Sequence, residues 1–340
     1  MFKSEVLAEL TRTHQPALRN LSDVEKILLE RFVGLEEPIR ALILAVASGE
    51  PLLLVGPPGT AKSRLIRAFC GLTGLLDEHD FSQSQDSYFE YLLTPFTEPG
   101  ELFGFYDISQ ISKGQLNRLD KGMMQNATVV YLDEVFNGSS AILNSILAFM
   151  NERIFHDRGV RKRVAMQYLF AASNQTPETA ELRAVYDRFV LRCEVANAKA
   201  EPNDLKALVQ AGWRETYSQQ PRRRNHATLL GEMQALRKSI ATFTDQGKLV
   251  PQQEMPFYNS LAQIVQHARQ YDLSEMSNRR LVKLVYIMLI HRIYEAAQAD
   301  KIPANLTLRE DELRLIPRFF LDRTETDIVE RMKRVEIRNG

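Results

Sequence analysis

The sequence predicts an α/β domain followed by an all-α domain, and two observations carry this prediction. Short apolar runs alternate with amphipathic helical segments over residues 1–200, which is typical of a parallel sheet covered by helices. After residue 200 only helical patterns remain. We therefore expect an N-terminal domain of helices and an α/β core at residues 1–200, and a helical domain at residues 201–340.

Capping signals and periodicity define the expected elements. Ser22-Asp23-Val24-Glu25 is a capping-box pattern that predicts a helix start, and Gly34 is a candidate helix end. Gly49 closes a second helix expected over residues 36–48. Strands are predicted at residues 51–55, 89–93, 128–132, 167–172 and 189–195. Helices are predicted over residues 62–75, 142–150, 203–213, 227–243, 256–271, 277–298 and 310–316.

The composition excludes several classes of protein. The 340 residues carry 43 Lys and Arg against 43 Asp and Glu, and a neutral chain argues against a general nucleic-acid or membrane coat, although a local basic patch is compatible with it. Cys70 and Cys193 are too few for a disulfide framework or a cysteine-based zinc site. The sequence lacks a signal-peptide pattern and an apolar run of membrane-spanning length, so we expect a cytoplasmic protein without a membrane span.

A phosphate-binding loop is predicted between the first strand and the next helix. Gly56-Pro57-Pro58-Gly59-Thr60-Ala61-Lys62-Ser63 follows the pattern G-x-x-x-x-G-K-[ST], except that Ala61 replaces the second glycine. Small residues let backbone N–H groups approach phosphate, Lys62 would reach the β- and γ-phosphates, and Ser63 would supply a hydroxyl ligand to Mg²⁺. Because alanine permits right-handed helical geometry, we expect Ala61 to disturb this chemistry little. The loop predicts binding of ATP with Mg²⁺.

Two carboxylates end the third predicted strand. Asp133 would hold Mg²⁺, mostly through water, and Glu134 would polarise the attacking water as a general base. Asn174 ends the next strand and could orient the same water. Since the carboxyl ends of parallel strands form the ligand crevice, we expect these groups near the phosphate loop.

Two groups of arginines are candidates for stabilising phosphate charge. Arg188, in Asp187-Arg188-Phe189, could act on the γ-phosphate in the transition state, and Arg183 competes for that role. In the second domain, Ser277-Asn278-Arg279-Arg280 opens a helix, and either arginine could reach a bound nucleotide.

Together these motifs resemble AAA+ ATPases, and specifically the MoxR family. GPPGTAKS, YLDEV, ASN, YDRF and SNRR occur in the family order over roughly residues 20–320. The stretches FEYLLTPFTEPGELFG and ILNSILAFMNER are most similar to the RavA-like subgroup. The resemblance implies a five-stranded sheet of order 5-1-4-3-2, a helical lid, and a ring that is usually a homo-hexamer.

The resemblance also assigns roles. It gives Lys62 and Ser63 to Walker A, Asp133 and Glu134 to Walker B, Asn174 to sensor 1, Arg188 to a trans-acting finger and Arg279 to sensor 2. Residues 96–122 become the helix-2 insertion, with glycine-containing loops suited to a mobile element facing a ring pore. Residues 156–163 become a hairpin insertion, whose charges (Arg158, Arg161, Lys162 and Arg163) either contact a substrate or neighbour or are simply solvated.

The implied function is a Mg²⁺-dependent ATPase that acts as a chaperone. It would remodel a protein client or assist metal or cofactor insertion, together with a von Willebrand factor A (vWA) domain partner. A nucleic-acid-remodelling motor, a Mg-chelatase-like subunit and a non-hydrolysing nucleotide switch are the alternatives. Glu134, Asn174 and Arg188 argue against the switch, and we do not expect nucleic acid as the main partner. Residues 222–224, a further basic run, are expected to form a solvated loop.

Overall fold

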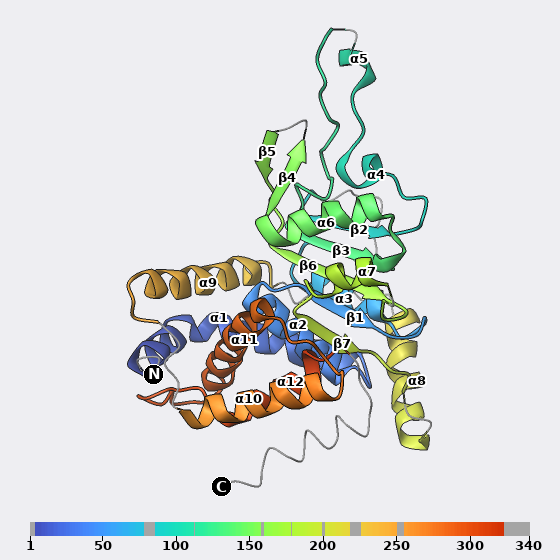
Figure 1. Cartoon of the computed structure of the whole chain (residues 1–340). Helices are drawn as coiled ribbons and strands as arrows, with labels where there is room; N and C mark the ends of the chain where they lie inside the picture. The colour runs from blue at the N-terminus through green and yellow to red at the C-terminus, as the bar shows by residue number, and fades with distance from the viewer. Residues whose placement is uncertain are drawn as a thin grey trace.

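The computed structural model describes residues 4–77, 86–111, 113–157, 160–177, 179–198, 201–217, 226–249 and 255–322. Five parallel strands form its main sheet: β1 (Leu52–Val55), β2 (Tyr88–Leu92), β3 (Val129–Asp133), β6 (Tyr168–Ser173) and β7 (Leu191–Glu194). They lie in the order β2-β3-β6-β1-β7 (Figure 1). Numbered 1 to 5 along the chain, these strands have the expected order 5-1-4-3-2. The predicted α/β fold class is confirmed.

The central strands β1, β3 and β6 are buried because helices cover the sheet, so they read as nearly continuous apolar runs, whereas the edge strand β2 is only partly buried. Every residue of β6 is buried, as are the first three of β1. In the parallel register, Val55 pairs with Ser173, and Leu92 pairs with Asp133. The carboxyl ends of the strands therefore align along one edge of the sheet, where the phosphate loop follows β1.

The first predicted domain contains the helices α1 (Ser4–Arg31), α2 (Glu36–Ser48), α3 (Lys62–Leu72), α6 (Ser140–Glu152) and α7 (Ala180–Tyr186). The second predicted domain contains α8 (Pro202–Tyr217), α9 (Leu229–Asp245), α10 (Met255–Gln270), α11 (Asn278–Ala297), the 3-10 helix η2 (Glu310–Arg314) and α12 (Leu315–Phe319). In the described ranges beyond Glu194 there are helices and no strand, as the sequence predicts. Gly49 ends α2 with φ +73°, also as predicted.

The predicted helix start at Ser22 is wrong. Helix α1 runs unbroken from Ser4 to Arg31, with Pro16 inside it. Ser22 is buried in the middle of this helix, and the Glu25 carboxylate accepts a hydrogen bond from the Tyr294 hydroxyl of α11. The capping-box residues therefore do not cap a helix. Their side chains face Tyr294 of the neighbouring helix α11.

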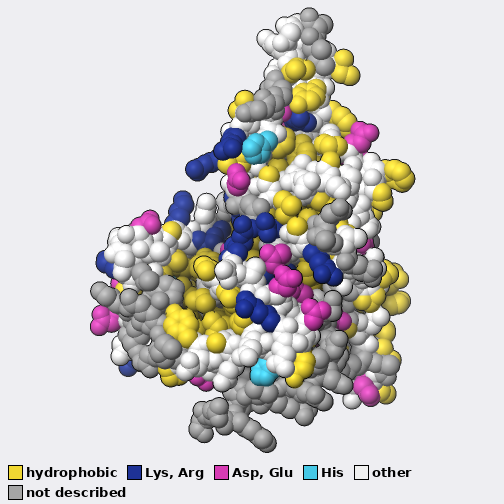
Figure 2. Space-filling model, viewed as in Figure 1, with side chains coloured by type: hydrophobic (Ala, Val, Ile, Leu, Met, Phe, Trp, Pro, Cys, Tyr) yellow, Lys and Arg dark blue, Asp and Glu magenta, His cyan; other side chains and the backbone are white. Residues whose placement is uncertain are grey.

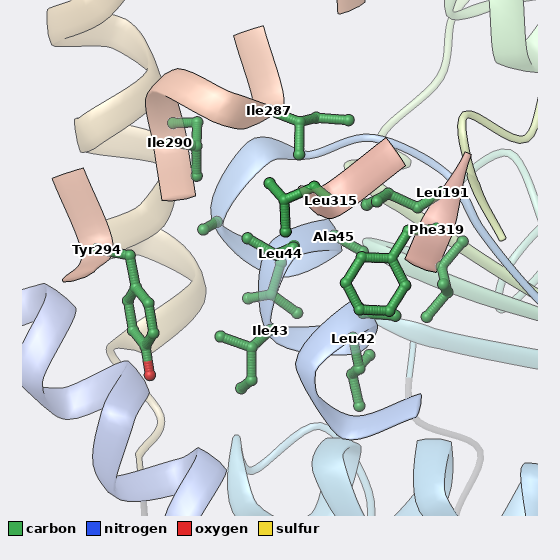
Figure 3. Close-up of a cluster of buried hydrophobic side chains, with 14 of the residues drawn as sticks. Leu42, Ile43, Leu44, Ala45, Leu191, Ile287, Ile290, Tyr294, Leu315 and Phe319 are labelled. Atoms are coloured by element: carbon green, nitrogen blue, oxygen red, sulfur yellow. The ribbon is translucent and has the colours of Figure 1, made fainter. Parts of the chain in front are cut away.

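The core continues from the sheet into the later helices. Helix α2 packs between β7 and the pair α11 and α12, where Leu42, Leu44, Leu191, Ile287 and Phe319 meet (Figure 3). Helix α1 packs on α9 and α11. Helices from the start of the chain thus share a core with the second predicted domain, and the boundary at residue 200 stays a prediction.

Two insertions protrude beyond β2 (Figure 1). The first carries α4 (Pro99–Phe103) and α5 (Ile108–Ile111), and the second is the antiparallel hairpin of β4 (Ile154–Asp157) and β5 (Val160–Arg163). The second confirms the hairpin expected from the sequence. None of the helices in the described ranges is long and apolar enough to cross a membrane.

Candidate active site

The loop after β1 is held at the sheet edge by close backbone contacts. The Gly56 N–H donates to the Ser173 carbonyl at 3.0 Å, and a Cβ on Gly56 would lie 2.0 Å from the Val195 carbonyl oxygen. The Thr60 hydroxyl closes the turn by donating to the Pro57 carbonyl at 2.9 Å. Glycine is therefore required at the first position of the motif for steric reasons.

Lys62 is buried at the centre of this loop. It is 7% exposed, and its Nζ donates to the carbonyls of Gly56 (2.6 Å) and Pro57 (3.0 Å) and to Oδ1 of Asn174 (3.2 Å). Burial lowers the pKa of Lys62, while the charges of Asp133 and Glu134 oppose that shift. The contacts fix a cation at the N-terminus of α3, where the helix dipole also favours an anion.

Ala61 adopts a left-handed conformation, so the expectation of right-handed geometry is wrong. Its φ is +62° and its ψ is 22°, and it is the N-cap of α3. Gly59 also has a positive φ, +83°. The backbone passes through this left-handed conformation at Ala61 before the right-handed helix α3 starts at Lys62. The Cβ of alanine makes that conformation costly, by about 1 kcal/mol or more.

Ser63 and Asp133 meet although they lie on different elements. The Ser63 hydroxyl donates to Oδ2 of Asp133 at 2.9 Å, and the Tyr131 hydroxyl donates to Ser63 Oγ at 3.1 Å. A carboxylate with a hydroxyl beside it suits Mg²⁺, which prefers oxygen ligands and takes one or two of them from the protein. The pair fits the predicted metal site. Tyr131 was missed in the sequence because an apolar strand gives no sign that its tyrosine hydroxyl reaches Ser63.

Glu134 also has left-handed backbone, with φ +50° and ψ 48°. Its N–H donates to Oδ1 of Asp133 at 3.0 Å, and its Oε2 accepts from the Asn174 N–H at 3.4 Å. Glu134 and Asn174 line a cavity of about 630 Å³. A non-glycine residue held in this conformation beside a cavity is typical of a functional site. Lys62, Ser63, Asp133, Glu134 and Asn174 are thus brought together as predicted.

The arginines form a second group. Arg188 pairs with Asp187 at 3.5 Å, and the pKa of Arg188 is lowered by burial and by the nearby charge of Arg279. Arg183 and Arg188 line a second cavity of about 380 Å³. This cavity shares Thr176 and Pro177 with the first one, so the loop after β6 separates the two.

The structure distinguishes the two arginines at the start of α11. Arg280 is 1% exposed, and its NH1 donates to Ser274 Oγ and Asp322 Oδ1, both at 2.9 Å. Arg279 is exposed. Arg280 is therefore committed to the interior, which leaves Arg279 as the one able to meet a ligand or a neighbouring chain.

The basic strand of the hairpin is exposed, whereas Phe155 and Asp157 of β4 are buried. All four residues of β5 are exposed, and Lys162 pairs with Asp157 at 3.2 Å. Arg158 and the basic run at residues 222–224 lie outside the described residues.

Comparison with known proteins identifies relatives. A family model described as the MoxR domain in the MoxR–vWA–β-propeller ternary systems matches residues 19–238. Two uncharacterized proteins of Methanocaldococcus jannaschii are 34% and 35% identical over 192 and 189 residues, which are 56% and 55% of this chain and 48% of each relative. The chain therefore spans about half the length of these relatives. A structural protein of Acidianus two-tailed virus is 27% identical over 174 residues, 51% of this chain and 26% of that protein.

A solved structure shares the fold over nearly the whole chain. The crystal structure of a protein of Cytophaga hutchinsonii, described as a candidate ATPase, aligns with a TM-score of 0.60 at 15% identity. The alignment covers 96% of each chain. At this identity the likeness concerns the fold alone.

Proposed function

Because the chain belongs to the MoxR family of AAA+ ATPases, in the branch found in MoxR–vWA–β-propeller systems, we propose that it hydrolyses ATP with Mg²⁺ in a ring of subunits. The observation that supports this most is the meeting of Lys62, Ser63, Asp133, Glu134 and Asn174 at one sheet edge. These residues come from three separate segments of the sequence. Their types match what phosphoryl transfer to water needs.

Each residue has a role that follows from its position. Lys62 and the backbone N–H groups at the start of α3 bind the phosphates, and Ser63 and Asp133 hold Mg²⁺. The metal, when bound with the nucleotide, neutralises charge on the phosphates. Glu134 takes the proton of the attacking water, and Asn174, hydrogen-bonded to Glu134 through its backbone, keeps that water oriented.

The arginine group supports a site shared between subunits. Arg188 and Arg279 are close enough for their charges to interact, and Arg188 faces a different cavity from that of Glu134. We infer that Arg188 acts as the finger on the nucleotide of a neighbouring subunit, with Arg279 as sensor 2. We propose a homo-hexamer, the ring that the family resemblance implies.

The client and partner follow from the family and from the surface. The family description names vWA-domain and β-propeller proteins, so we propose partners of these two kinds and a chaperone role toward a protein client. Apolar side chains are exposed on the first insertion, and Figure 2 shows apolar side chains on this protrusion; such patches suit a protein contact. They are Phe96, Phe105, Ile108, Leu116 and Leu119. We place this activity in the cytoplasm, where ATP is available, and retain the RavA-like subgroup as a proposal.

A nucleic-acid-remodelling motor is the second candidate, because Arg161 and Arg163 are exposed on β5. DNA binding that weakens steeply with salt and is lost in an Arg161→Ala, Lys162→Ala double variant would favour it. Absence of DNA binding at low salt would leave the protein client. The same motifs are compatible with a Mg-chelatase-like subunit.

The activity is tested by ATP turnover of the purified chain. We expect hydrolysis that requires Mg²⁺, stops with EDTA, and is lost in Lys62→Ala together with ATP binding. Lys26→Ala, which removes an exposed lysine on α1, is the matched control and should turn over ATP like the wild type. A wild-type chain that binds ATP and Mg²⁺ without hydrolysis would show instead a nucleotide switch.

A further inference from the structure

Two sequence motifs that lie about ninety residues apart meet at one carboxylate. Asp187, of Tyr186-Asp187-Arg188-Phe189, accepts the Ser277 hydroxyl at 3.4 Å on each of its oxygens. Its Oδ2 lies 3.5 Å from NH1 of Arg188, and its Oδ1 lies 4.0 Å from NH1 of Arg280. Asp187 therefore joins the segment that carries Arg188 to the start of α11.

Ser277 contributes to this junction in an unusual way for a helix start. It is the N-cap residue of α11, yet its hydroxyl makes no capping bond to the helix. A serine cap bond stabilises a helix by about 1 kcal/mol. The hydroxyl is turned instead toward Asp187, across from the helix. A residue that forgoes its local partner for a distant one indicates a function for the distant contact.

The start of α11 is itself firmly held. Arg280 is buried, donates to Ser274 and Asp322, and also donates to the Phe320 carbonyl. The Asp322 carboxylate also pairs with the buried Arg192 of β7. Asp187 thus has a fixed support on its α11 side.

Arg188 depends on Asp187 for its orientation. Its Nε is buried and has no hydrogen-bond partner among the described residues, and Asp187 is its ion-pair partner. The charge of Arg279 repels it from the direction of α11. The Asp187 carboxylate offsets part of this repulsion and holds the guanidinium at the second cavity, which both residues line.

We propose that Asp187 is a positioning residue that sets where Arg188 is presented to a neighbouring nucleotide, using Ser277 and the start of α11 as its support. This inference rests on the proposed function, because it requires that Arg188 acts on ATP bound by another subunit. The inference goes beyond the proposed function because it links the position of helix α11 to ATP hydrolysis in the neighbouring subunit. A shift of α11 would move Asp187, and with it Arg188.

The test is subunit mixing. In Asp187→Asn we expect kcat to fall by about tenfold or more with KM for ATP within about twofold of the wild type, because the nucleotide site of the same chain is untouched. Glu275→Gln is the matched control, since Glu275 lines the same cavity and its loss removes one charge without touching Arg188, Asp187 or Ser277. It should keep the wild-type kcat.

Mixing Asp187→Asn with Glu134→Gln separates a positioning role from a structural one. Glu134→Gln subunits cannot hydrolyse ATP but still present an intact Arg188, so the mixture should exceed the summed rates of the two variants alone. A mixture no faster than that sum, or an Asp187→Asn variant with raised KM and unchanged kcat, would overturn the proposal.

A second variant covers a failure to fold. If Asp187→Asn does not fold, Ser277→Ala removes the support while it keeps the Asp187 charge, and since the hydroxyl makes no cap bond the helix should persist. It should lower kcat and be rescued by the same mixing, and a wild-type kcat here would overturn the inference. A wild-type chain without ATPase activity would instead refute the proposed function, whereas active wild type with an unaffected Asp187→Asn would refute this inference alone.

Discussion

The Ser63 hydroxyl donates a hydrogen bond of 2.9 Å to the Asp133 carboxylate across 70 residues of sequence. This bond joins the first turn of α3 to the end of β3. It places two oxygen ligands side by side at the mouth of the phosphate loop. The proposed metal site depends on this pair.

Ser63→Ala should weaken the response to Mg²⁺. The variant removes one of the two oxygen ligands, so we expect the Mg²⁺ concentration for half-maximal ATP turnover to rise by about tenfold, as loss of a ligand commonly does. Titration of turnover with MgCl₂ at saturating ATP measures this. Ser145→Ala, on α6, is the control. An unchanged Mg²⁺ midpoint in Ser63→Ala would show that the hydroxyl is no ligand.

Ala61→Gly should stabilise the chain. Glycine relieves the left-handed strain at φ +62° but adds freedom to the unfolded chain, so the net gain should be about 0.5–1 kcal/mol in the free energy of unfolding. Urea denaturation of both proteins checks it. The reverse change, Gly59→Ala at φ +83°, should destabilise. A loss of stability in Ala61→Gly would mean that the alanine methyl makes contacts that outweigh the strain.

The strands and most residues of the candidate site can be predicted from the sequence, because both depend on local sequence patterns. The strands are visible because residues buried on both faces form apolar runs, and Lys62, Asp133 and Asn174 are visible because each follows such a run at the same sheet edge. Parallel order and register then bring them together. Most residues of the candidate site could therefore be predicted from the sequence alone.

What the sequence could not predict depends on distant partners or on backbone angles. Ser22 and Glu25 resemble a capping box, but their partner is Tyr294 of α11, which lies more than 250 residues away in sequence. Ala61 gave no sign of its positive φ, because that angle is imposed by the loop and the start of α3. The choice of Arg279 over Arg280 required the burial of Arg280 against Ser274 and Asp322, contacts that no spacing rule specifies.

Asp157→Asn should loosen the first insertion. Asp157 is 2% exposed and holds Lys162 at 3.2 Å and Arg118 at 3.3 Å, so it connects the hairpin to the stem of the insertion. Loss of its charge leaves Arg118 in a partly buried position without its anion. Limited proteolysis should cut residues 96–122 several-fold faster, whereas Asp107→Asn, farther out on the insertion, should not change the rate much. Equal cleavage in Asp157→Asn and wild type would refute this connection.

The stability of the chain should fall in mild acid through His291. Burial, with the charges of Arg318, Arg292 and Arg40, lowers the pKa of His291 to about 4 from 6.5. Below pH 6.5 His291 is protonated in the unfolded chain, whereas in the folded chain it stays neutral until about pH 4. The free energy of unfolding therefore decreases as the pH falls from 6.5 to 4. This group should cost about 2 kcal/mol between pH 7 and pH 5.

Denaturant unfolding at pH 7 and pH 5 measures the effect of His291. His291→Gln should lose less stability than the wild type over this interval, by roughly the same amount, because glutamine cannot be protonated. Carboxylates remote from His291 act equally in both proteins and cancel in the difference, whereas Glu295, which lies 3.8 Å from His291, is replaced by glutamine in both proteins of the comparison. An identical pH dependence in the two proteins would show that His291 is protonated freely in the folded chain.

The central claim is that Glu134 activates water at a site built from Lys62, Ser63, Asp133 and Asn174. The most direct measurement is the ATP turnover of Glu134→Gln beside that of the wild type, with ATP affinity measured on the same preparations. We expect turnover to fall by about 100-fold or more and ATP affinity to stay within about twofold, because the amide keeps the shape of the side chain but cannot take a proton. Equal turnover by the two proteins would contradict the account.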